Sequence, residues 1–292
     1  MKLQVAARTL ALSPLFNRAQ NLWERNRQNV NMPLSKFDKL LVGTYLILRD
    51  FSQGQFPPSF DDQQKAYEAE IGFRYSLPGV DAAAVTNAML RKPFWYGRQF
   101  KAYMTGFMNL VGTFEQVGVE PPQKLLELGC GMGWMSEFLA LMSFDVVGTS
   151  ISSLDIQDAQ TRVESLKAKH LGTQLEFRTT PMESVAEAVQ DRTPFDCIFV
   201  FEALHHAYDW RQAVESSYSS LRPGGWLIIA NEPNVLHTFI SYRIAKLTNA
   251  HELGFTQNEL IQNLKQTGFR KITILKNAFG FYLRPHWIAA KK

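Results

Sequence analysis

Three glycines separated by single residues follow a short apolar run at residues 125–135, which read LLELGCGMGWM. Gly129, Gly131 and Gly133 have no Cβ and adopt positive φ at little cost, so a ligand can lie directly against this backbone. The stretch 124–128 predicts a short buried strand and 134–142 predicts a helix. A glycine loop between a strand and a helix points backbone N–H groups at its ligand. The loop alone does not identify that ligand.

The elements that must position this loop form a repeating pattern from Lys124 onward. The predicted strands span 124–128, 145–149, 174–178, 195–201, 225–230, 271–276 and 282–289, and the predicted helices lie near 134–142, 153–170, 182–190, 210–221 and 256–267. Alternation of this kind requires right-handed crossovers, which predict an α/β fold with a mostly parallel sheet. Ligands of such sheets bind beyond the carboxyl ends of the strands, where the glycine loop would lie.

The first 119 residues lack this alternation. Their apolar residues recur at helical spacing, a Pro- and Gln-rich stretch at 51–64 indicates a loop, and an aromatic-rich helix is expected over 94–114. The sequence therefore predicts an N-terminal helical cap or substrate lid at 1–119, followed by a second domain at 120–292.

The net charge of +4 resides in the N-terminal arm. Residues 1–30 contain five basic residues and one acidic residue, which leaves the rest of the chain neutral. A neutral body disfavours nucleic acid as a partner, because nucleic-acid binding needs many phosphate contacts. We interpret the arm as a basic amphipathic helix of the fold rather than a transit peptide, with peripheral contact to an anionic membrane as a further possibility.

The cysteine content and hydropathy indicate a reducing compartment. The chain has two cysteines, Cys130 and Cys197, which suggests no disulfide framework. No apolar run approaches the roughly 18 residues that span a bilayer, and the N-terminus lacks a secretory signal. We therefore expect a cytoplasmic location. The oligomeric state is not predicted.

Four segments occur in the order and spacing of one enzyme family. They are ELGCGMGW (127–134), FDCIFVFEALHHAYDW (195–210), LRPGGWLIIANEP (221–233) and GFTQNELIQNLKQTGFRKITIL (254–275). Together they resemble the class I S-adenosylmethionine-dependent methyltransferases from Lys124 to Lys291. The resemblance implies a doubly wound, seven-stranded, mostly parallel sheet with an antiparallel last strand. It also implies an N-terminal helical cap and S-adenosylmethionine as the cofactor.

The resemblance assigns a set of residues to that cofactor. They are Glu127, Gly129, Cys130, Gly131, Gly133, Ser150, Ile151, Met182, Glu202, Arg98 and Tyr96. The glycine backbone would approach the amino acid half of the cofactor, whose ammonium group Glu127 would orient. Arg98 would pair with the carboxylate, and Tyr96 or Tyr103 would shield the sulfonium through cation–π attraction. The alternative is a plain core helix with aromatic packing.

Two positions depart from the family pattern. Ser150 stands where an acidic residue usually binds both ribose hydroxyls, and it lacks a charge-assisted hydrogen bond worth about 1.5–3 kcal/mol. Pro181 stands where an acidic residue often meets the adenine amine. Some relatives that act on lipids also have a hydroxyl residue at the first position. Ile151 and Met182 are either walls of the adenine site or ordinary core side chains.

Two adjacent histidines are the candidates for catalysis. Methyl transfer from a sulfonium needs an aligned nucleophile and, for a hydroxyl acceptor, a base that removes its proton. His205 and His206 lie in the loop that sits beside the cofactor's methyl group in similar enzymes, and a neutral imidazole suits this task. Because one of the two is more often a structural cap, we favour His206 as the base.

The segment 231–254 is interpreted as an insertion that contacts substrate. Glu232, Asn234 and His237 are predicted to hydrogen-bond the substrate, with a solvated polar loop as the alternative. A metal site is also conceivable because His251 and Glu252 follow. Since these two are adjacent rather than arranged as H-E-x-x-H, their side chains would point apart, and no metal is predicted.

The sequence thus predicts a methyltransferase that methylates a hydroxyl oxygen of a small molecule or glycan. The first alternative is carbon methylation of a lipid or quinone at a membrane surface, motivated by Ser150 and the basic arm. The second is a non-catalytic domain that keeps the fold for binding or assembly, motivated by the two missing carboxylates. RNA methylation is disfavoured by the neutral body.

Overall fold

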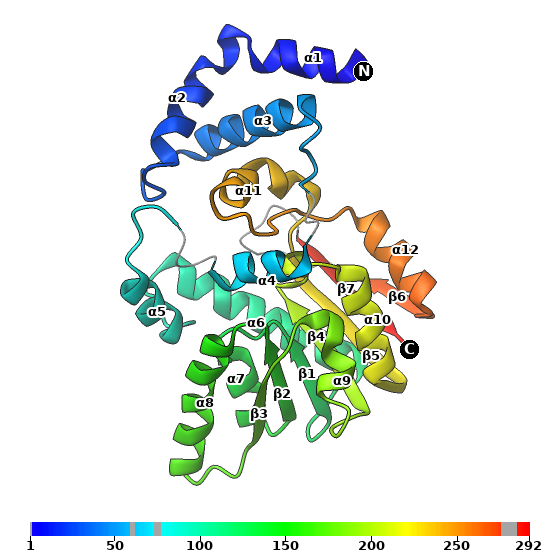
Figure 1. The fold of residues 1–292 in the computed structure, drawn as a ribbon. Coiled ribbons are helices and arrows are strands. Elements are labelled where there is room, and N and C mark those ends of the chain that lie inside the picture. The colour runs from blue at the N-terminus through cyan, green and yellow to red at the C-terminus, as the bar shows by residue number, and fades with distance from the viewer. Residues whose placement is uncertain (1, 59–61, 73–76, 276–284) are drawn as a thin grey trace. The chain divides into compact units, whose positions relative to one another are not determined.

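The computed structural model describes residues 2–58, 62–72, 77–275 and 285–292 (Figure 1). The chain forms two compact units. Unit 1 comprises Met1–Thr86 together with Val235–Gly254, and unit 2 comprises Asn87–Asn234 together with Phe255–Lys292. Most of the predicted insertion at 231–254 is therefore part of unit 1.

Unit 2 is built on a seven-stranded sheet. Its strands are β1 (Lys124–Leu128), β2 (Asp145–Ser150), β3 (Gln174–Thr179), β4 (Phe195–Phe201), β5 (Leu221–Glu232), β6 (Lys271–Ile274) and β7 (His286–Lys291). They lie in the order β3-β2-β1-β4-β5-β7-β6, and β7 runs antiparallel to both of its neighbours while the other pairs are parallel. The predicted fold class is confirmed. Residues 276 and 282–284 of the last two predicted strands lie outside the described residues.

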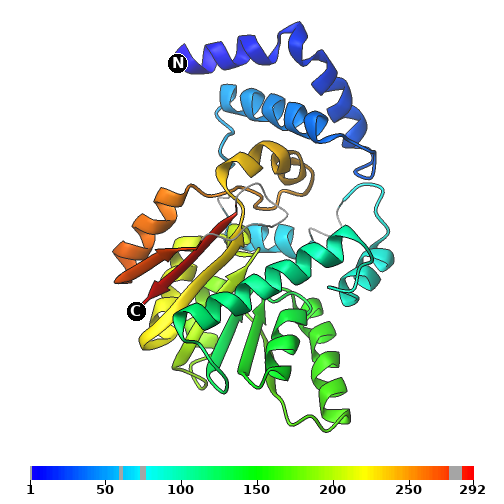
Figure 2. The same cartoon turned by 180° about the vertical axis from the view of Figure 1, so that it is seen from behind.

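Helices cover both faces of this sheet (Figures 1 and 2). They are α6 (Arg98–Val117), α7 (Trp134–Leu141), α8 (Ser153–Ala168), α9 (Val185–Ala188), α10 (Trp210–Ser220) and α12 (Gln257–Thr267). The helix predicted at 182–190 is shorter than expected, because Met182–Ser184 forms a 3-10 turn before α9. Similarly, β5 begins at Leu221 rather than 225, with a shift of register opposite Phe195 and Cys197.

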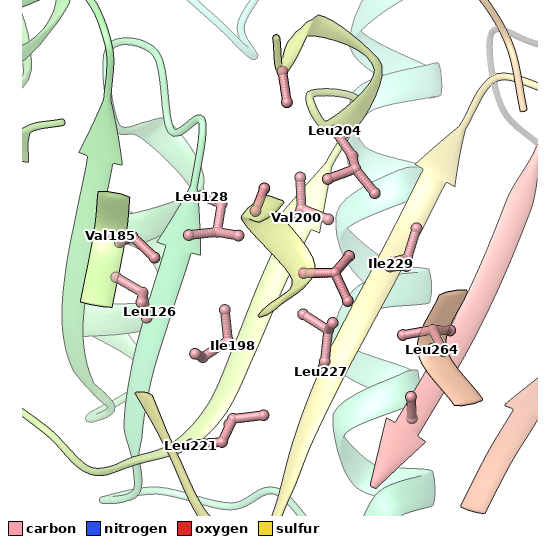
Figure 3. Close-up of a cluster of buried hydrophobic side chains, with 14 of the residues drawn as sticks. Leu126, Leu128, Val185, Ile198, Val200, Leu204, Leu221, Leu227, Ile229 and Leu264 are labelled. Atoms are coloured by element: carbon pink, nitrogen blue, oxygen red, sulfur yellow. The ribbon is translucent and has the colours of Figure 1, made fainter. Parts of the chain in front are cut away.

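The strands are apolar on both faces because both faces are covered. Ile198 and Val200 of β4 pack in one core cluster with residues of α9, α10 and α12 (Figure 3). Their neighbours Cys197 and Phe199 point to the opposite face, into a second cluster with residues of α6 and α7. This explains why β4 reads as a continuous apolar run instead of an alternating one.

Unit 1 is helical. Its helices are α1 (Lys2–Ala11), α2 (Asn17–Asn26), α3 (Lys36–Ser52), α4 (Gln63–Gly72) and α11 (Val235–Thr248), and α5 (Ala82–Leu90) spans the boundary with unit 2. The helix α11 packs against α3 so closely that a Cβ on Gly43 would lie 1.8 Å from the carbonyl oxygen of Phe239. Only glycine allows this approach of two helix backbones.

A buried carboxylate also joins α3 to α11. Asp50 is fully buried and accepts hydrogen bonds from the Tyr242 hydroxyl at 2.9 Å and from the Arg49 guanidinium at 2.8 Å. The Lys246 ammonium lies 3.0 Å from the same carboxyl group. Burial by itself raises the pKa of Asp50, but these donors outweigh it and the pKa is lowered. The ionised carboxylate is therefore a polar anchor inside unit 1.

None of the described helices is long and apolar enough to cross a membrane.

Candidate active site

The glycine loop follows β1 at the carboxyl edge of the sheet and leads into α7 (Figure 1). Gly129, Gly131 and Gly133 have φ values of 68°, 52° and 74°, so all three adopt the left-handed region that other residues avoid. Gly129 and Gly131 are partly exposed, whereas Gly133 is buried. A Cβ on Gly133 would lie 2.3 Å from the Phe177 ring. Packing therefore explains the third glycine, and Gly131 presents partly exposed backbone that a ligand can reach.

A second loop, after β4, lies directly against the glycine loop. A Cβ on Gly129 would lie 2.6 Å from the Ala203 Cβ and 2.7 Å from the Met182 Cε. Ala203 precedes the 3-10 turn Leu204–His206, which contains both candidate histidines. The structure thus brings together the glycine loop, Met182 and the histidine turn, which lie far apart in the sequence.

Glu232 at the end of β5 holds the histidine turn in place. Its fully buried carboxylate accepts hydrogen bonds from the backbone N–H of Ala203 at 2.7 Å, of Leu204 at 2.8 Å and of His205 at 3.3 Å. Nδ1 of His205 lies 2.8 Å from the same carboxylate. Burial raises the pKa of Glu232, but His205 and the backbone donors outweigh burial and the pKa is lowered.

The two histidines differ in their exposure. His205 is buried beside Glu232, while His206 is partly exposed, and their ring centroids are 4.1 Å apart. An imidazole held by a carboxylate has a set orientation, and a partly exposed imidazole can meet another molecule. Glu232 was predicted to contact substrate. In the structure its oxygens instead interact with backbone N–H groups of the chain itself and with the His205 ring.

Strained backbone marks the ends of β4 and β5. Glu202 and Asn231 have φ values of 52° and 54°, and neither is a glycine. The Asn231 side-chain amide donates to the Glu202 carboxylate. Left-handed conformations at non-glycine residues cluster at functional sites, where surrounding contacts maintain them.

Two carboxyl groups at this edge have pKa values raised to about 7. Burial raises the pKa of Glu127, and the Ser136 hydroxyl, which donates to it at 2.5 Å, lowers it in part. Burial also raises the pKa of Glu202 to about 7, against the lowering effect of nearby Lys92. Lys92 lowers the pKa of Glu127 as well. Both carboxyl groups therefore change charge near neutral pH, and a bound cation would stabilise their ionised forms.

Sequence reasoning missed Lys92. Its ammonium lies 4.2 Å from the centre of the Tyr103 ring, and Tyr103 packs edge-on against Trp134 at the start of α7. Tyr96, which was predicted to contact the cofactor, is fully exposed, and Arg98 is exposed. The sequence around Lys92 contains no motif that indicates a function. The effect of Lys92 on the pKa of Glu127 is evident only in the folded structure.

The other predicted cofactor residues lie near the same edge. Ser150 ends β2, is buried, and accepts a hydrogen bond from the Ser152 N–H at 3.2 Å, while Ile151 is partly exposed. Cys130 is buried, and burial raises the pKa of its thiol well above the usual value, so the thiol stays protonated.

The predicted substrate residues fall into both units. Asn234 is the last residue of the first segment of unit 2, where it forms an isolated parallel bridge with Phe255. His237 belongs to α11 of unit 1. In unit 1 the His251 N–H donates to the Glu70 carboxylate at 2.5 Å.

A family model described as a methyltransferase domain matches residues 94–274, which is more than half of the chain. The chain belongs to this methyltransferase family. The match confirms the enzyme class and the methyl donor, S-adenosylmethionine, that the resemblance implied.

Several known proteins are similar to this methyltransferase. It is 24% identical over 163 residues to a ubiquinone biosynthesis O-methyltransferase of Bordetella avium, a match covering 53% of this chain and 65% of the relative. It is 30% identical over 190 residues to the protein of the same name from Ruegeria pomeroyi, covering 61% and 72%. This chain thus matches just under two thirds of the Bordetella avium protein.

A solved structure supports the same fold. Magnesium protoporphyrin IX methyltransferase from Synechocystis PCC 6803, determined with bound S-adenosylhomocysteine, has 17% sequence identity and a TM-score of 0.55. The similarity covers 79% of this chain and all of that one (100%).

The residues at the carboxyl edge fit the cofactor. Gly129 and Gly131 have positive φ and partly exposed backbone, which a ligand can approach directly. The carboxyl groups of Glu127, which is buried, and of Glu202, which is partly exposed, are suited to a cationic ligand, because a positive charge offsets their loss of hydration.

We expect cofactor affinity to fall as the pH is lowered from about 7.5 to about 5.5. Glu127 and Glu202, with pKa values of about 7, take up protons in this range and lose their attraction for the cofactor's ammonium group. Each group would lower the affinity by up to about tenfold per pH unit below its pKa. Calorimetric titration with S-adenosylhomocysteine measures this dependence. In the variant Glu127→Gln the affinity should depend less steeply on pH. An equally steep dependence would contradict a role of Glu127 in binding the cofactor.

Proposed function

We propose that the protein transfers a methyl group from S-adenosylmethionine to a phenolic hydroxyl oxygen of a small molecule. One observation carries this proposal, namely the direct contact between the glycine loop and the histidine turn at Ala203. Cofactor-binding backbone and a candidate base therefore adjoin at one edge of the sheet.

Each residue has a role in this proposal. The backbone of Gly129 and Gly131 and the carboxylate of Glu127 bind the amino acid half of the cofactor. Glu202 adds negative charge at the same edge, beside Asn231. When bound, the cofactor supplies a methyl group on a sulfonium, which is the electrophile of the reaction.

The histidine turn supplies the base. The His206 imidazole would accept the hydroxyl proton and pass it to solvent, while the bound cofactor would supply the methyl group to the acceptor oxygen and leave as S-adenosylhomocysteine. His205 and Glu232 are positioning residues: the buried carboxylate fixes the turn through three backbone N–H groups and the His205 ring. Such preorganisation keeps the base within reach of the acceptor.

Two arguments favour a phenol over the glycan hydroxyl that the sequence also allowed. A phenol has a pKa of about 10, as tyrosine does, so its proton is removed far more readily than that of a sugar hydroxyl. In addition, the relatives at 24% and 30% identity are named as O-methyltransferases of ubiquinone biosynthesis. Asn234 and His237 remain our predicted substrate contacts.

We expect the purified protein to methylate catechols or hydroxybenzoates, and His206→Gln to lower kcat about 100-fold, because general-base assistance is lost. The affinity for S-adenosylhomocysteine should stay unchanged. Mass spectrometry detects the product, and carbon-13 NMR with a labelled methyl group distinguishes oxygen from carbon methylation.

The control is His170→Gln, since His170 is exposed after α8 and lies outside the proposed site. If only glycosides were methylated, the acceptor would be a sugar hydroxyl and not a phenol. A carbon-methylated product would favour the lipid or quinone alternative. Binding of S-adenosylhomocysteine without methylation of any acceptor would support a non-catalytic domain.

A further inference from the structure

The N-terminal helices of unit 1 carry an excess of positive charge that the acidic residues of the described part of the chain do not neutralise. Residues 2–50 contain three acidic residues, and each lies beside an arginine of the same segment, in the pairs Glu24–Arg27, Asp38–Arg18 and Asp50–Arg49 at 2.8 Å each. The other basic side chains of this segment have no acidic partner among the described residues; they are Lys2, Arg8, Arg25, Lys36 and Lys39.

The same helices expose large apolar side chains. The exposed fractions are 76% for Leu3, 60% for Val5, 45% for Leu10, 68% for Leu12, 68% for Leu15, 64% for Phe37 and 43% for Leu40. We call these residues, together with the five basic ones above, the N-terminal surface. Seven exposed large apolar side chains within residues 3–40 exceed the single scattered ones of an ordinary protein surface, and such an excess indicates interaction with proteins or membranes.

The packing within unit 1 explains why these side chains remain outside. The buried positions of α1 are the small residues Ala7 and Ala11, which allow α1 to lie close to α3. Both views show α1 beside α3 within unit 1 (Figures 1 and 2). Pro14 begins a 3-10 turn (Pro14–Phe16) between α1 and α2, and Leu12 before the turn and Leu15 within it are both exposed. Unit 1 therefore completes its core without them.

The chemistry of the N-terminal surface selects its partner. Leucine and phenylalanine side chains gain from an apolar phase, and lysine and arginine gain from anionic groups at the border of that phase. A second copy of the chain would bring two positively charged surfaces together, which repel each other. From these observations we propose that the N-terminal surface docks the protein on an anionic lipid bilayer, with α1 and the start of α3 in contact with the headgroups. The inference does not depend on the identity of the methyl acceptor.

Vesicle co-sedimentation of the full chain tests this proposal. Vesicles of phosphatidylcholine with phosphatidylglycerol should bind the protein at least about tenfold more strongly than vesicles of phosphatidylcholine alone, and added salt should weaken the binding. The double variant Lys2→Glu/Arg8→Glu should lose about tenfold or more of this binding. Its control, Lys167→Glu/Lys169→Glu on and just after α8, has the same net charge and should bind as the wild type.

The apolar part of the N-terminal surface needs its own variant. Leu12→Ser/Leu15→Ser should weaken binding about tenfold, and Leu154→Ser/Leu171→Ser, which changes two exposed leucines of unit 2, should not. All variants should bind S-adenosylhomocysteine with equal affinity. This measurement is the control that unit 2 stays folded.

Three results would overturn the proposal. The first is failure of the wild type to sediment with anionic vesicles. The second is equal binding by the test and control variants. The third is a concentration-dependent dimer in analytical ultracentrifugation that Leu12→Ser/Leu15→Ser abolishes, which would assign the surface to a second copy. None of these readouts involves methyl transfer, so failure here leaves the proposed function intact.

Discussion

Replacing Gly131 with valine is expected to weaken binding of S-adenosylhomocysteine at least about 100-fold. Gly131 has a φ of 52°, a conformation that β-branched residues rarely adopt, and its backbone is partly exposed at the carboxyl edge of the sheet. A branched side chain here would occupy the space against the main chain and shift the loop, and losing two hydrogen bonds of about 1.5 kcal/mol each corresponds to roughly 100-fold in affinity. Isothermal titration calorimetry measures the loss directly.

The matched control is Gly112→Val on α6. Gly112 is exposed, and a Cβ there would meet no other atom within 4 Å. This variant should bind S-adenosylhomocysteine as the wild type does. Because positive φ also strains the valine at 131, the thermal midpoint of each variant is needed to show that the protein is folded. A folded Gly131→Val protein with unchanged affinity would exclude the glycine loop as the cofactor site.

The second large effect is expected at Glu232. Its carboxylate is fully buried and accepts hydrogen bonds from Ala203, Leu204 and His205, so Glu232→Ala leaves buried N–H groups without an acceptor. Each buried N–H group left without an acceptor costs about 1–3 kcal/mol, so we expect the free energy of unfolding to fall by about 3 kcal/mol. The histidine turn would also lose its support, and kcat/KM should fall about 1000-fold, within the range of general-base effects.

Two variants separate this role from a general loss of charge. Glu232→Gln retains one acceptor oxygen and should recover much of the stability, whereas Glu164→Ala on the exposed side of α8 should change neither quantity. Chemical denaturation gives the stability, and product formation gives kcat/KM. If Glu232→Ala raised KM alone, with stability and kcat unchanged, Glu232 would be a substrate contact, as the sequence suggested, and not a positioning residue.

Much of the fold was predictable because its signals are local. The run 124–141 contains a buried strand, a glycine loop and a helix in direct succession, and the structure shows all three, with positive φ at each glycine of the loop. The apolar runs of β1, β2 and β4 reflect burial on both sheet faces, which each strand's own sequence records.

Other features depend on residues that are distant in sequence. The carboxylate of Glu232 lies 29 residues after Ala203, and nothing near either residue signals their hydrogen bond. The same holds for Lys92, whose effect on Glu127 arises from the packing of the segment before α6. Likewise, α11 follows β5 in sequence but packs against α3 in unit 1, because Gly43 admits it and Asp50 anchors it.

The sequence by itself determined the enzyme family, the order of strands and helices, and the glycine loop that we propose as the cofactor site, since periodicity and turn chemistry act over a few neighbouring residues. The tertiary structure decided which carboxyl groups are buried, which histidine is held and which is partly exposed, and which apolar side chains unit 1 leaves outside. Parallel strand pairing brings the ends of β1, β4 and β5 to one edge of the sheet, and burial at that edge raises the pKa values of Glu127 and Glu202 to about 7.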